Sequence, residues 1–174
     1  MKEENEIHTL DYTDLQLLDT LQRDASLSNQ ALAERLALSP PTCLRRVRRL
    51  QAQGLLTQTV SIVDPERLAA FIGHGLQVLV EVTLERQDSK TLDEFERAAV
   101  ADTCVQQCWR VSPGPDFVLV IYTRDMPSYL ALSQRLFAQH QQVRNIKAFF
   151  ATKRAKFGTH IPTIERPTAS ENNH

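Results

Sequence analysis

The chain has little of several features that mark particular classes of protein. Its three cysteines are an odd number, which argues against a disulfide framework and favours buried thiols in a reducing cytoplasm. Cys104 and Cys108 lie four residues apart with no histidine nearby, so no metal site is expected. No apolar run approaches the ~18 residues of a membrane span. The acidic, polar start of the chain is unlike a signal peptide, so we expect a cytoplasmic protein.

Signatures of catalysis are also missing. The histidines are scattered, and no Ser/His/Asp set or carboxylate pair has a definable spacing. Gly73 and Gly75 do not make a phosphate-binding loop. We therefore expect no catalytic residues, no cofactor and no enzymatic activity.

Acidic residues are absent from one long stretch. The 174 residues carry a formal net charge of -1, yet residues 35–63 contain no Asp or Glu, whereas residues 1–34 are rich in acids. A basic patch on a near-neutral protein favours selective docking on a polyanion over general adhesion.

What the sequence does contain in this region is three short amphipathic helices. Leucines at helical spacing predict the first over residues 11–24, with Asp11 as its N-cap. Ser28 is placed to cap a second helix, and Ser39 a third that Gly54 ends. Two short helices joined by a tight connection, the second rich in arginine, are typical of a helix-turn-helix.

The third predicted helix has two faces. One stripe must face the core: Cys43, Val47 and Leu50. The opposite stripe is polar: Thr42, Arg45, Arg46 and Arg49. The helix contains no acids to neutralise its arginines, and like charges four residues apart are mildly unfavourable. This pattern favours a DNA-binding face over a merely solvated basic one. RNA is the other polyanion, but no aromatic residues are interleaved to stack on unpaired bases.

Position along the helix suggests a role for each residue. Those near its start are best placed for base edges: Pro41, Thr42, Arg45 and Arg46. Arg48 and Arg49 are expected to hold phosphates, which gives affinity without sequence information. Ser28 and Ser39, beside exposed helix N–H groups, are further phosphate candidates.

The remainder of the chain alternates strands and helices. Residues 55–63 predict a connecting strand, with some chance of pairing to a second subunit, and residues 66–75 a short helix or turn. Strands are then expected at 76–84, 105–111, 117–123 and 146–157, and helices at 89–100 and 127–140. The order βαββαβ is that of a ferredoxin-like domain. The expected fold is therefore α+β: an N-terminal winged helix-turn-helix DNA-binding domain plus a C-terminal ferredoxin-like βαββαβ domain.

These elements suggest domain boundaries. We expect an N-terminal tail at 1–9, the DNA-binding domain at 10–60, a linker at 61–75, the ferredoxin-like domain at 76–158 and a flexible tail at 159–174. One sheet face would be left bare by the helices. Five apolar residues are expected on it: Val78, Val80, Val118, Val120 and Phe150. A bare apolar face on so small a domain predicts dimerisation.

The features described so far resemble those of the Lrp/AsnC (leucine-responsive, feast/famine) family of transcription regulators. The resemblance is strongest at residues 38–54, LSPPTCLRRVRRLQAQG, and continues through Asp64-Pro65 and the βαββαβ half to about Phe157. It implies a dimer that associates further, commonly to an octamer, and an amino-acid effector bound between C-terminal domains.

In the family, the effector loop follows the second strand of the C-terminal domain and contains roughly Ser-Gly-acid-aromatic-Asp. The matching residues here are Ser112, Pro113, Gly114, Pro115 and Asp116, preceded by Arg110. Two prolines remove backbone donors that could hold a carboxylate, whereas Asp116 could pair with an ammonium group. The alternative is a rigid hairpin turn that binds nothing. Trp109 next to the loop favours a core or interface position over a ligand wall.

Two functions therefore compete. The first is a sequence-specific regulator of double-stranded DNA, oligomeric and responsive to an amino acid or related metabolite. The second is a non-specific, nucleoid-type DNA-organising protein without an effector, whose many helix-turn-helix copies would bind multivalently.

Overall fold

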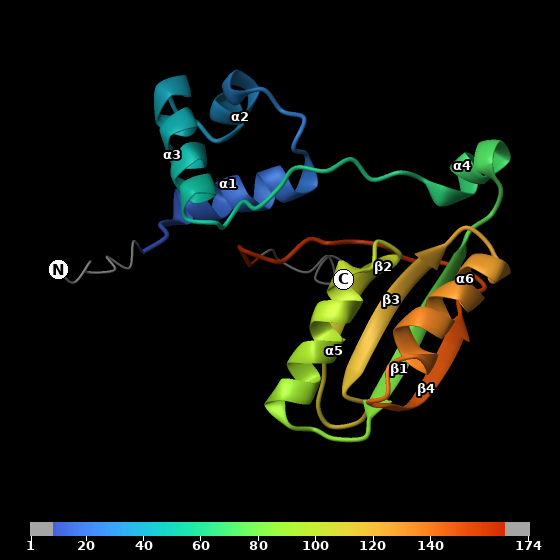
Figure 1. Cartoon of the computed structure of the whole chain (residues 1–174). Coiled ribbons are helices and arrows are strands. Elements are labelled where there is room, and N and C mark those ends of the chain that lie inside the picture. Colours follow the sequence, from blue (N-terminus) through green and yellow to red (C-terminus); the bar gives the residue numbers. More distant parts are fainter. Residues whose placement is uncertain (1–8, 166–174) are drawn as a thin grey trace, which may run out of the picture. The chain divides into compact units, whose positions relative to one another are not determined.

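The computed structural model describes residues 9–165, which form two compact units. The N-terminal unit takes the chain up to Ser61 and again from Lys156, and the sheet unit takes Ile62–Ala155. Figure 1 shows both units. Most of the expected N-terminal tail, and residues 166–174 of the expected C-terminal one, lie outside the described residues.

Three helices build the N-terminal unit, as expected: α1 (Tyr12–Arg23), α2 (Asn29–Arg35) and α3 (Pro40–Ala52). Asp11 caps α1 in a reciprocal capping box with Asp14. Ser28 caps α2 by accepting from the backbone N–H of Ala31. Ser39 precedes α3 but makes no cap bond, because its hydroxyl donates to Thr42 Oγ1 at 2.8 Å.

The apolar faces of these helices meet in one small core. Its buried members are Leu17, Leu18, Leu32, Ala33, Cys43 and Leu50. Burial raises the pKa of the Cys43 thiol, so it packs there as a neutral group. Cys104 and Cys108 in the sheet unit are only partly buried, contrary to the expectation of three buried thiols.

The turn between α2 and α3 is tight. Ala37 takes a left-handed backbone conformation with φ of 53°, the region that favours glycine. The amide N–H of Leu38 then donates to the carbonyl of Ala33, and the side-chain amide of Asn29 donates to the carbonyl of Pro40. The two bonds fix where α3 begins relative to α2.

The expected strand at residues 55–63 is wrong for the single chain. Among the described residues, this segment has no hydrogen-bonded partner strand, and its Val60, Ile62 and Val63 side chains are exposed. A β-branched sequence favours extended backbone, but a strand also requires a neighbour. Helix α4 (Pro65–Ile72) follows, capped by Asp64.

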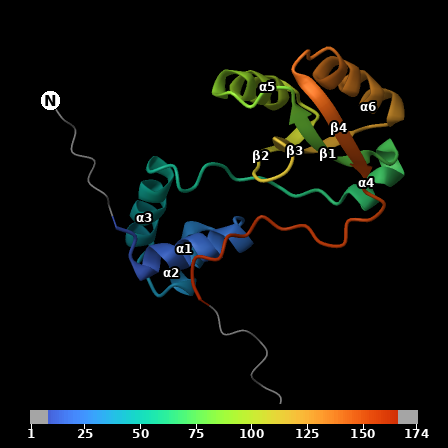
Figure 2. The same ribbon diagram turned by 90° about the horizontal axis from the view of Figure 1, so that it is seen from below.

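The sheet unit has the predicted βαββαβ order. It contains β1 (Leu76–Leu84), α5 (Ser89–Ala101), β2 (Val105–Arg110), β3 (Phe117–Thr123), α6 (Met126–Ser133) and β4 (Val143–Phe150). A single turn of π-helix, Gln134–Ala138, extends α6. The strands form one antiparallel sheet in the order β2-β3-β1-β4, and both helices cover the same face (Figures 1 and 2). This is the ferredoxin-like arrangement.

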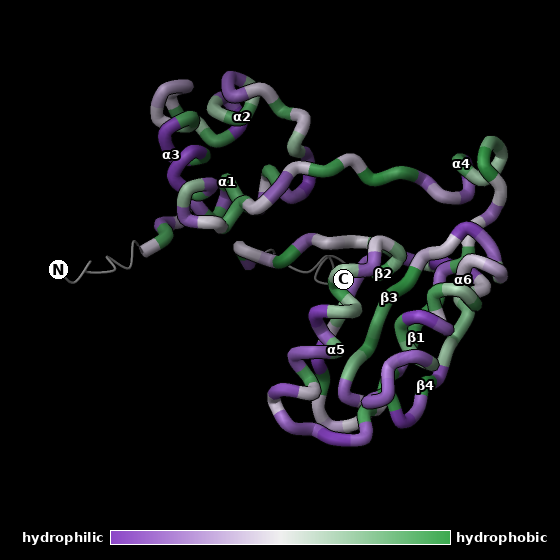
Figure 3. The backbone as a smooth tube through the Cα atoms, in the orientation of Figure 1, coloured by the Kyte–Doolittle hydropathy of each residue, from purple (hydrophilic) through white to green (hydrophobic). Residues whose placement is uncertain are grey.

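The core of this unit lies between the helices and the sheet. Alternate residues of β1 and β3 point into it, and Phe95 of α5 stacks on Phe117 of β3 at 4.9 Å between ring centroids. The hydropathy colouring shows β3 as an apolar segment and much of α3 as a polar one (Figure 3).

The bare sheet face matches the expectation on β3 and differs from it by one residue on β1 and β4. Val78 and Val80 are fully buried under the helices, and Phe150, opposite Val78, packs on Tyr129 of α6. In a strand a shift of one residue moves a side chain to the other face. Val118 and Val120 lie on the bare face, as expected, and their neighbours there are Leu79, Phe149 and Trp109. Leu79, Trp109 and Phe149 are 42%, 57% and 52% exposed.

The last strand also begins and ends earlier than expected. After Phe150 the chain leaves the sheet, and from Lys156 it belongs to the N-terminal unit. Residues 160–163 hydrogen-bond to α1, so the described part of the expected flexible tail is docked. The expectation rested on the lack of a periodic apolar stripe, whereas the docking contacts are polar.

Candidate nucleic-acid interface and ligand site

The four arginines of α3 fall into two pairs. Arg46 binds Asp11 at 2.7 Å and Asp14 at 2.8 Å, and Arg49 binds the other oxygen of Asp14. Both acids come from the start of α1. The side chain of Asp14 is 1% exposed, so it is a buried carboxylate held by two guanidinium groups.

These contacts alter the electrostatics of the α1–α3 contact. The backbone N–H of Asp14 and then the Arg46 guanidinium lower the pKa of the Asp11 carboxyl, and Asp11 and Asp14 raise the pKa of Arg46. Arg46 and Arg49, predicted on the polar stripe opposite the core, are thus turned to the acids of α1. Helix α3 contains no acid of its own, and the neutralising acids lie 32 and 35 residues earlier in the chain.

The second pair is free. Arg45 and Arg48 are exposed, and within residues 9–165 neither has a hydrogen-bonded or ion-paired partner. They share the outward face of α3 with Pro41 and Leu44, which is 38% exposed. Thr42 is half-buried, with its hydroxyl bound by Ser39. The face turned to solvent is thus apolar and cationic, a combination suited to base edges, thymine methyls and phosphates.

In the sheet unit, Arg110 does not join the loop that follows it. Its guanidinium binds Asp93 at 2.7 Å and Glu96 at 2.6 Å, both on α5, and lies 5.7 Å from the centroid of the Phe117 ring. These contacts raise the pKa of Arg110. It joins the end of β2 to the helix layer, on the side away from the bare face.

Asp116 is likewise committed to the fold. It is 7% exposed, its carboxylate accepts from the backbone N–H of Leu84 at 2.7 Å, and its own N–H donates to the Val82 carbonyl. The pairing of β1 with β4 shifts register at Leu84, so the carboxylate satisfies an amide beside this irregularity. The expected ammonium partner of an effector is thus already bound to the backbone.

Two residues of the loop, Gly114 and Pro115, form one wall of a cavity. Ser112, Pro113 and Gly114 are exposed, and Gly114 has a φ of 130° that only glycine adopts without strain. A cavity of about 240 Å³ is lined by Glu81, Thr83, Gly114, Pro115, Asn145 and Lys147. Four of these come from β1 and β4 and were not predicted. The signal in the sequence was Glu81, the one charged residue of β1.

Charge at this cavity is of both signs. Glu81 Oε2 lies 3.8 Å from Lys147 Nζ across neighbouring strands, and both side chains are partly exposed. A wider hollow of about 500 Å³ lies beside the start of α5, but several of its charges are paired among themselves, Arg86 with Asp88 and Lys90 with Glu94. The smaller cavity is the one that the loop reaches.

Residues 9–165 contain neither a candidate metal site nor a candidate membrane-spanning helix. No group of three or more His, Cys, Asp or Glu is placed to hold a metal ion. None of the described helices combines the length and apolar character needed to span a membrane.

Comparisons with known proteins agree with this geometry. Residues 10–57 match the winged helix-turn-helix DNA-binding family, and residues 77–161 match the Lrp/AsnC ligand binding domain. The chain is 37% identical over 123 residues to the leucine-responsive regulatory protein of Escherichia coli K12, covering 71% of this chain and 73% of that protein. It is 33% identical over 144 residues to an HTH-type transcriptional regulator of Haemophilus influenzae, covering 83% of each.

Solved structures give the same result. A transcriptional regulator of Neisseria meningitidis in complex with L-Met superposes with a TM-score of 0.77 at 29% identity, covering 88% of this chain and 97% of that one. An AsnC family regulator of Agrobacterium tumefaciens gives 0.77 at 25% identity, with the same coverage. Fold and comparisons together define a DNA-binding transcriptional regulator with a separate ligand-binding domain. The chain belongs to the Lrp/AsnC family.

Proposed function

We propose that this regulator reads double-stranded DNA with the face of α3 that carries Pro41, Arg45 and Arg48. The observation that carries the proposal is the division of the arginines: Arg46 and Arg49 are neutralised by Asp14, whereas Arg45 and Arg48 are exposed and unpaired within the described chain. Arg45, nearer the helix start, reads a base edge, and Arg48 holds a phosphate. Ser28 and Ser39, exposed before α2 and α3, supply further phosphate contacts.

The division supplies a matched test, because each arginine removed changes the net charge by the same amount. A binding site is first selected from randomised duplexes, and affinity is then measured against salt for Arg45→Ala, Arg48→Ala and Arg46→Ala. We expect Arg45→Ala to reduce discrimination between the selected and a scrambled site by about 1–3 kcal/mol. Arg48→Ala should weaken binding to both duplexes equally and lower the salt slope by about 1.

Arg46→Ala is the control, measured at a temperature at which circular dichroism shows every variant folded. It should lower thermal stability and leave discrimination unchanged. Equal loss of discrimination in all three variants would contradict the division. A wild-type protein that binds every duplex equally would favour the DNA-organising alternative.

For the effector we propose a free amino acid at the cavity beside the Pro-Gly-Pro loop. Glu81 faces its ammonium group and Lys147 its carboxylate, because the two side chains present opposite charges 3.8 Å apart at the cavity wall. Asn145 and Thr83 add hydrogen-bonding groups. The L-Met bound to the Neisseria relative supports this class of ligand.

A thermal-shift screen of the common amino acids tests this proposal. The hit is then compared with its amine and acid analogues, which lack the carboxylate or the ammonium group. Both analogues should fail to bind, and Glu81→Gln and Lys147→Gln should abolish the shift. Glu85→Gln, at the wider hollow, is the matched control and should retain it. No shift with any amino acid would favour the rigid-turn alternative.

We also propose that a second copy covers the bare sheet face. Leu79, Trp109 and Phe149 are exposed there beside Val118 and Val120, and contiguous apolar surface of this kind marks interfaces. Light scattering should give a dimer or a multiple of it, up to an octamer, and Trp109→Glu should shift the mass towards the monomer.

A further inference from the structure

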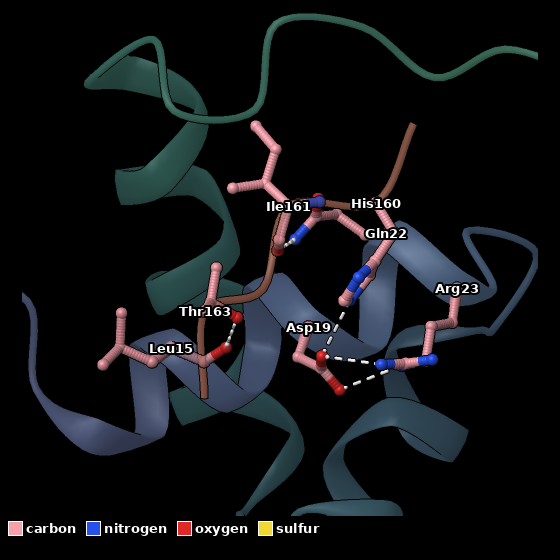
Figure 4. Close-up of polar contacts among 7 residues, drawn as sticks. All are labelled: Leu15, Asp19, Gln22, Arg23, His160, Ile161 and Thr163. Carbon is pink, nitrogen blue, oxygen red and sulfur yellow. Dashed lines mark hydrogen bonds and ion pairs between the residues drawn. The ribbon is translucent and has the colours of Figure 1, made fainter. Parts of the chain in front are cut away.

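A short stretch near the C-terminus, residues 160–163, lies along α1 and is called the strap here (Figure 4). His160 Nε2 is 2.9 Å from Asp19 Oδ1, and the Thr163 hydroxyl donates to the Leu15 carbonyl at 2.9 Å. Between them, Gln22 binds Ile161 twice: its amide donates to the Ile161 carbonyl at 3.0 Å, and its oxygen accepts from the Ile161 N–H at 2.8 Å.

The receiving residues lie on one side of the helix. Leu15, Asp19 and Gln22 are spaced i, i+4 and i+7, so they form a single stripe along α1. Asp19 is 2% exposed and also binds both ends of the Arg23 guanidinium fork at 3.1 and 3.2 Å. Ile161 is held through its backbone, since its side chain remains 69% exposed. The contact is therefore a built, polar docking surface and not a chance apolar one.

Docking changes how the N-terminal unit is attached. The chain passes from the N-terminal unit to the sheet unit through residues 53–64 and returns through residues 151–159, and neither segment contains a helix or strand. With the strap released, residues 53–64 would be the single tether. With the strap docked there are two, which restricts the orientations open to α3.

We propose that the strap is a second attachment that positions the DNA-binding unit, with Gln22, Asp19 and Leu15 as its receptor on α1 and residues 160–163 of the same chain as the occupant. This proposal rests on the DNA binding proposed above, by a dimer whose two copies of α3 must contact two half-sites at a fixed spacing. Limiting the freedom of each unit raises the effective concentration of the second α3 once the first has bound. Binding to two half-sites therefore depends on the strap, and binding to one does not.

The first arm of the test concerns docking alone. In the full chain, Gln22→Ala combined with Thr163→Val removes three of the strap's hydrogen bonds while nearly conserving the volume of Thr163. Hydrogen exchange of a peptide covering residues 159–165 should be at least about 10-fold faster in this variant than in the wild type. Gln16→Ala, at another position of α1, is the matched control and should leave exchange unchanged. Equal, unprotected exchange in wild type and variant would overturn the proposal.

The second arm concerns DNA. Affinity is measured at fixed salt for a duplex with two half-sites and for one with a single half-site. Releasing the strap should weaken the first by about 10-fold and the second by less than about 2-fold. An unchanged two-site affinity in a variant whose strap has been released overturns the positioning role. Equal losses on both duplexes would do so as well, because they indicate damage to the N-terminal unit itself.

These arms separate the strap from the proposed function. If the wild type binds neither duplex, DNA binding fails while the exchange result stands. If it binds DNA but the exchange arm shows no protection, the strap fails and DNA binding stands.

Discussion

The two units bury their interiors in different ways. Among the described residues, the core of the sheet unit holds thirteen buried apolar residues, whereas that of the N-terminal unit holds six. The smaller unit adds two nearly inaccessible carboxylates, Asp14 and Asp19, each bound by basic side chains from elsewhere in the unit. A small domain buries too little apolar surface to be stable by that means alone. Directed ionic contacts supply part of what its core lacks.

Buried acids also serve different partners in the two units. Asp14 joins α1 to two side chains of α3, whereas Asp116 satisfies one backbone amide of β1. The first carboxylate determines how two helices are held together, and the second stabilises a local irregularity of the sheet. Loss of Asp14 should therefore affect a whole unit, and loss of Asp116 a smaller part of one.

The largest effect is expected for Asp14→Ala. It leaves two guanidinium groups without their common partner, and loss of one member of a buried ion pair costs about 3–5 kcal/mol. Because Arg46 and Arg49 are 21% and 40% exposed and water can solvate them, we expect about 2–3 kcal/mol. Trp109, the one tryptophan, reports on the sheet unit. The urea midpoint should therefore fall more when unfolding is followed by far-UV circular dichroism than when it is followed by Trp109 fluorescence.

Equal shifts in both probes would mean that the two units unfold as one and would contradict the comparison. Asp64→Ala is the control for loss of a carboxylate, since the exposed Asp64 belongs to the sheet unit and caps α4. It should leave the transition of the N-terminal unit unchanged.

Asp116→Ala should have the next largest effect, about 2 kcal/mol, because it leaves the buried amide of Leu84 without its charged acceptor. For this variant the urea midpoint followed by fluorescence should fall, whereas the unfolding transition of the N-terminal helices should stay unchanged. Ser112→Ala, exposed in the same loop, should change stability by less than about 0.5 kcal/mol. If the two variants are equally stable, the Asp116 carboxylate does not support the loop.

The sequence predicted the helices and strands well because local signals determine them. Asp11 and Ser28 cap the helices that they were expected to cap, and the apolar run of residues 117–123 gave β3 its bounds. In β1 the run LQVLVEVTL alternates in part: one face is wholly apolar, whereas the other carries Gln77, Glu81 and Thr83 beside Leu79. This alternation indicates that Val80 lies inside, so the expected bare face did not follow the pattern of the strand. The register with β3 and β4 confirms that Leu79 lies on the outer face.

The candidate sites were predicted less completely, because their partners come from distant segments. Nothing near Arg46 in the sequence indicates Asp14, and nothing near His160 indicates Asp19. The helical wheel of α3 found the apolar stripe but not the difference between its arginines, since a wheel contains no other helix. Likewise, the loop motif indicated residues 112–116, whereas the charged wall of the cavity comes from β1 and β4.

Acid should destabilise both units. The backbone and hydroxyl groups at the starts of α1, α5 and α6 lower the pKa of their N-cap carboxyls: Asp11, Asp88 and Asp125. A lowered folded-state pKa means that the unfolded chain binds protons first, so stability is present at neutral pH and is lost as pH falls from about 4. Protonation of Asp11 also removes its ion pair with Arg46 in the N-terminal unit. Urea midpoints between pH 7 and pH 3, followed by both probes, check this, and a rise in stability on acidification would contradict it.

The smallest effect tests the turn before α3. Ala37 has a φ of 53°, a conformation that costs an alanine about 1–2 kcal/mol and a glycine almost nothing. Glycine also loses about 0.4–1 kcal/mol more backbone entropy on folding, so Ala37→Gly should stabilise the N-terminal unit by about 0.5 kcal/mol net. Ala31→Gly, inside α2 with ordinary helical backbone, is the matched control and should cost about 1 kcal/mol. The two substitutions remove the same methyl group, so opposite signs in the circular dichroism transition would assign the gain to backbone strain at Ala37. A loss of stability in both variants would mean that the turn relaxes and that the positive φ of Ala37 does not position α3.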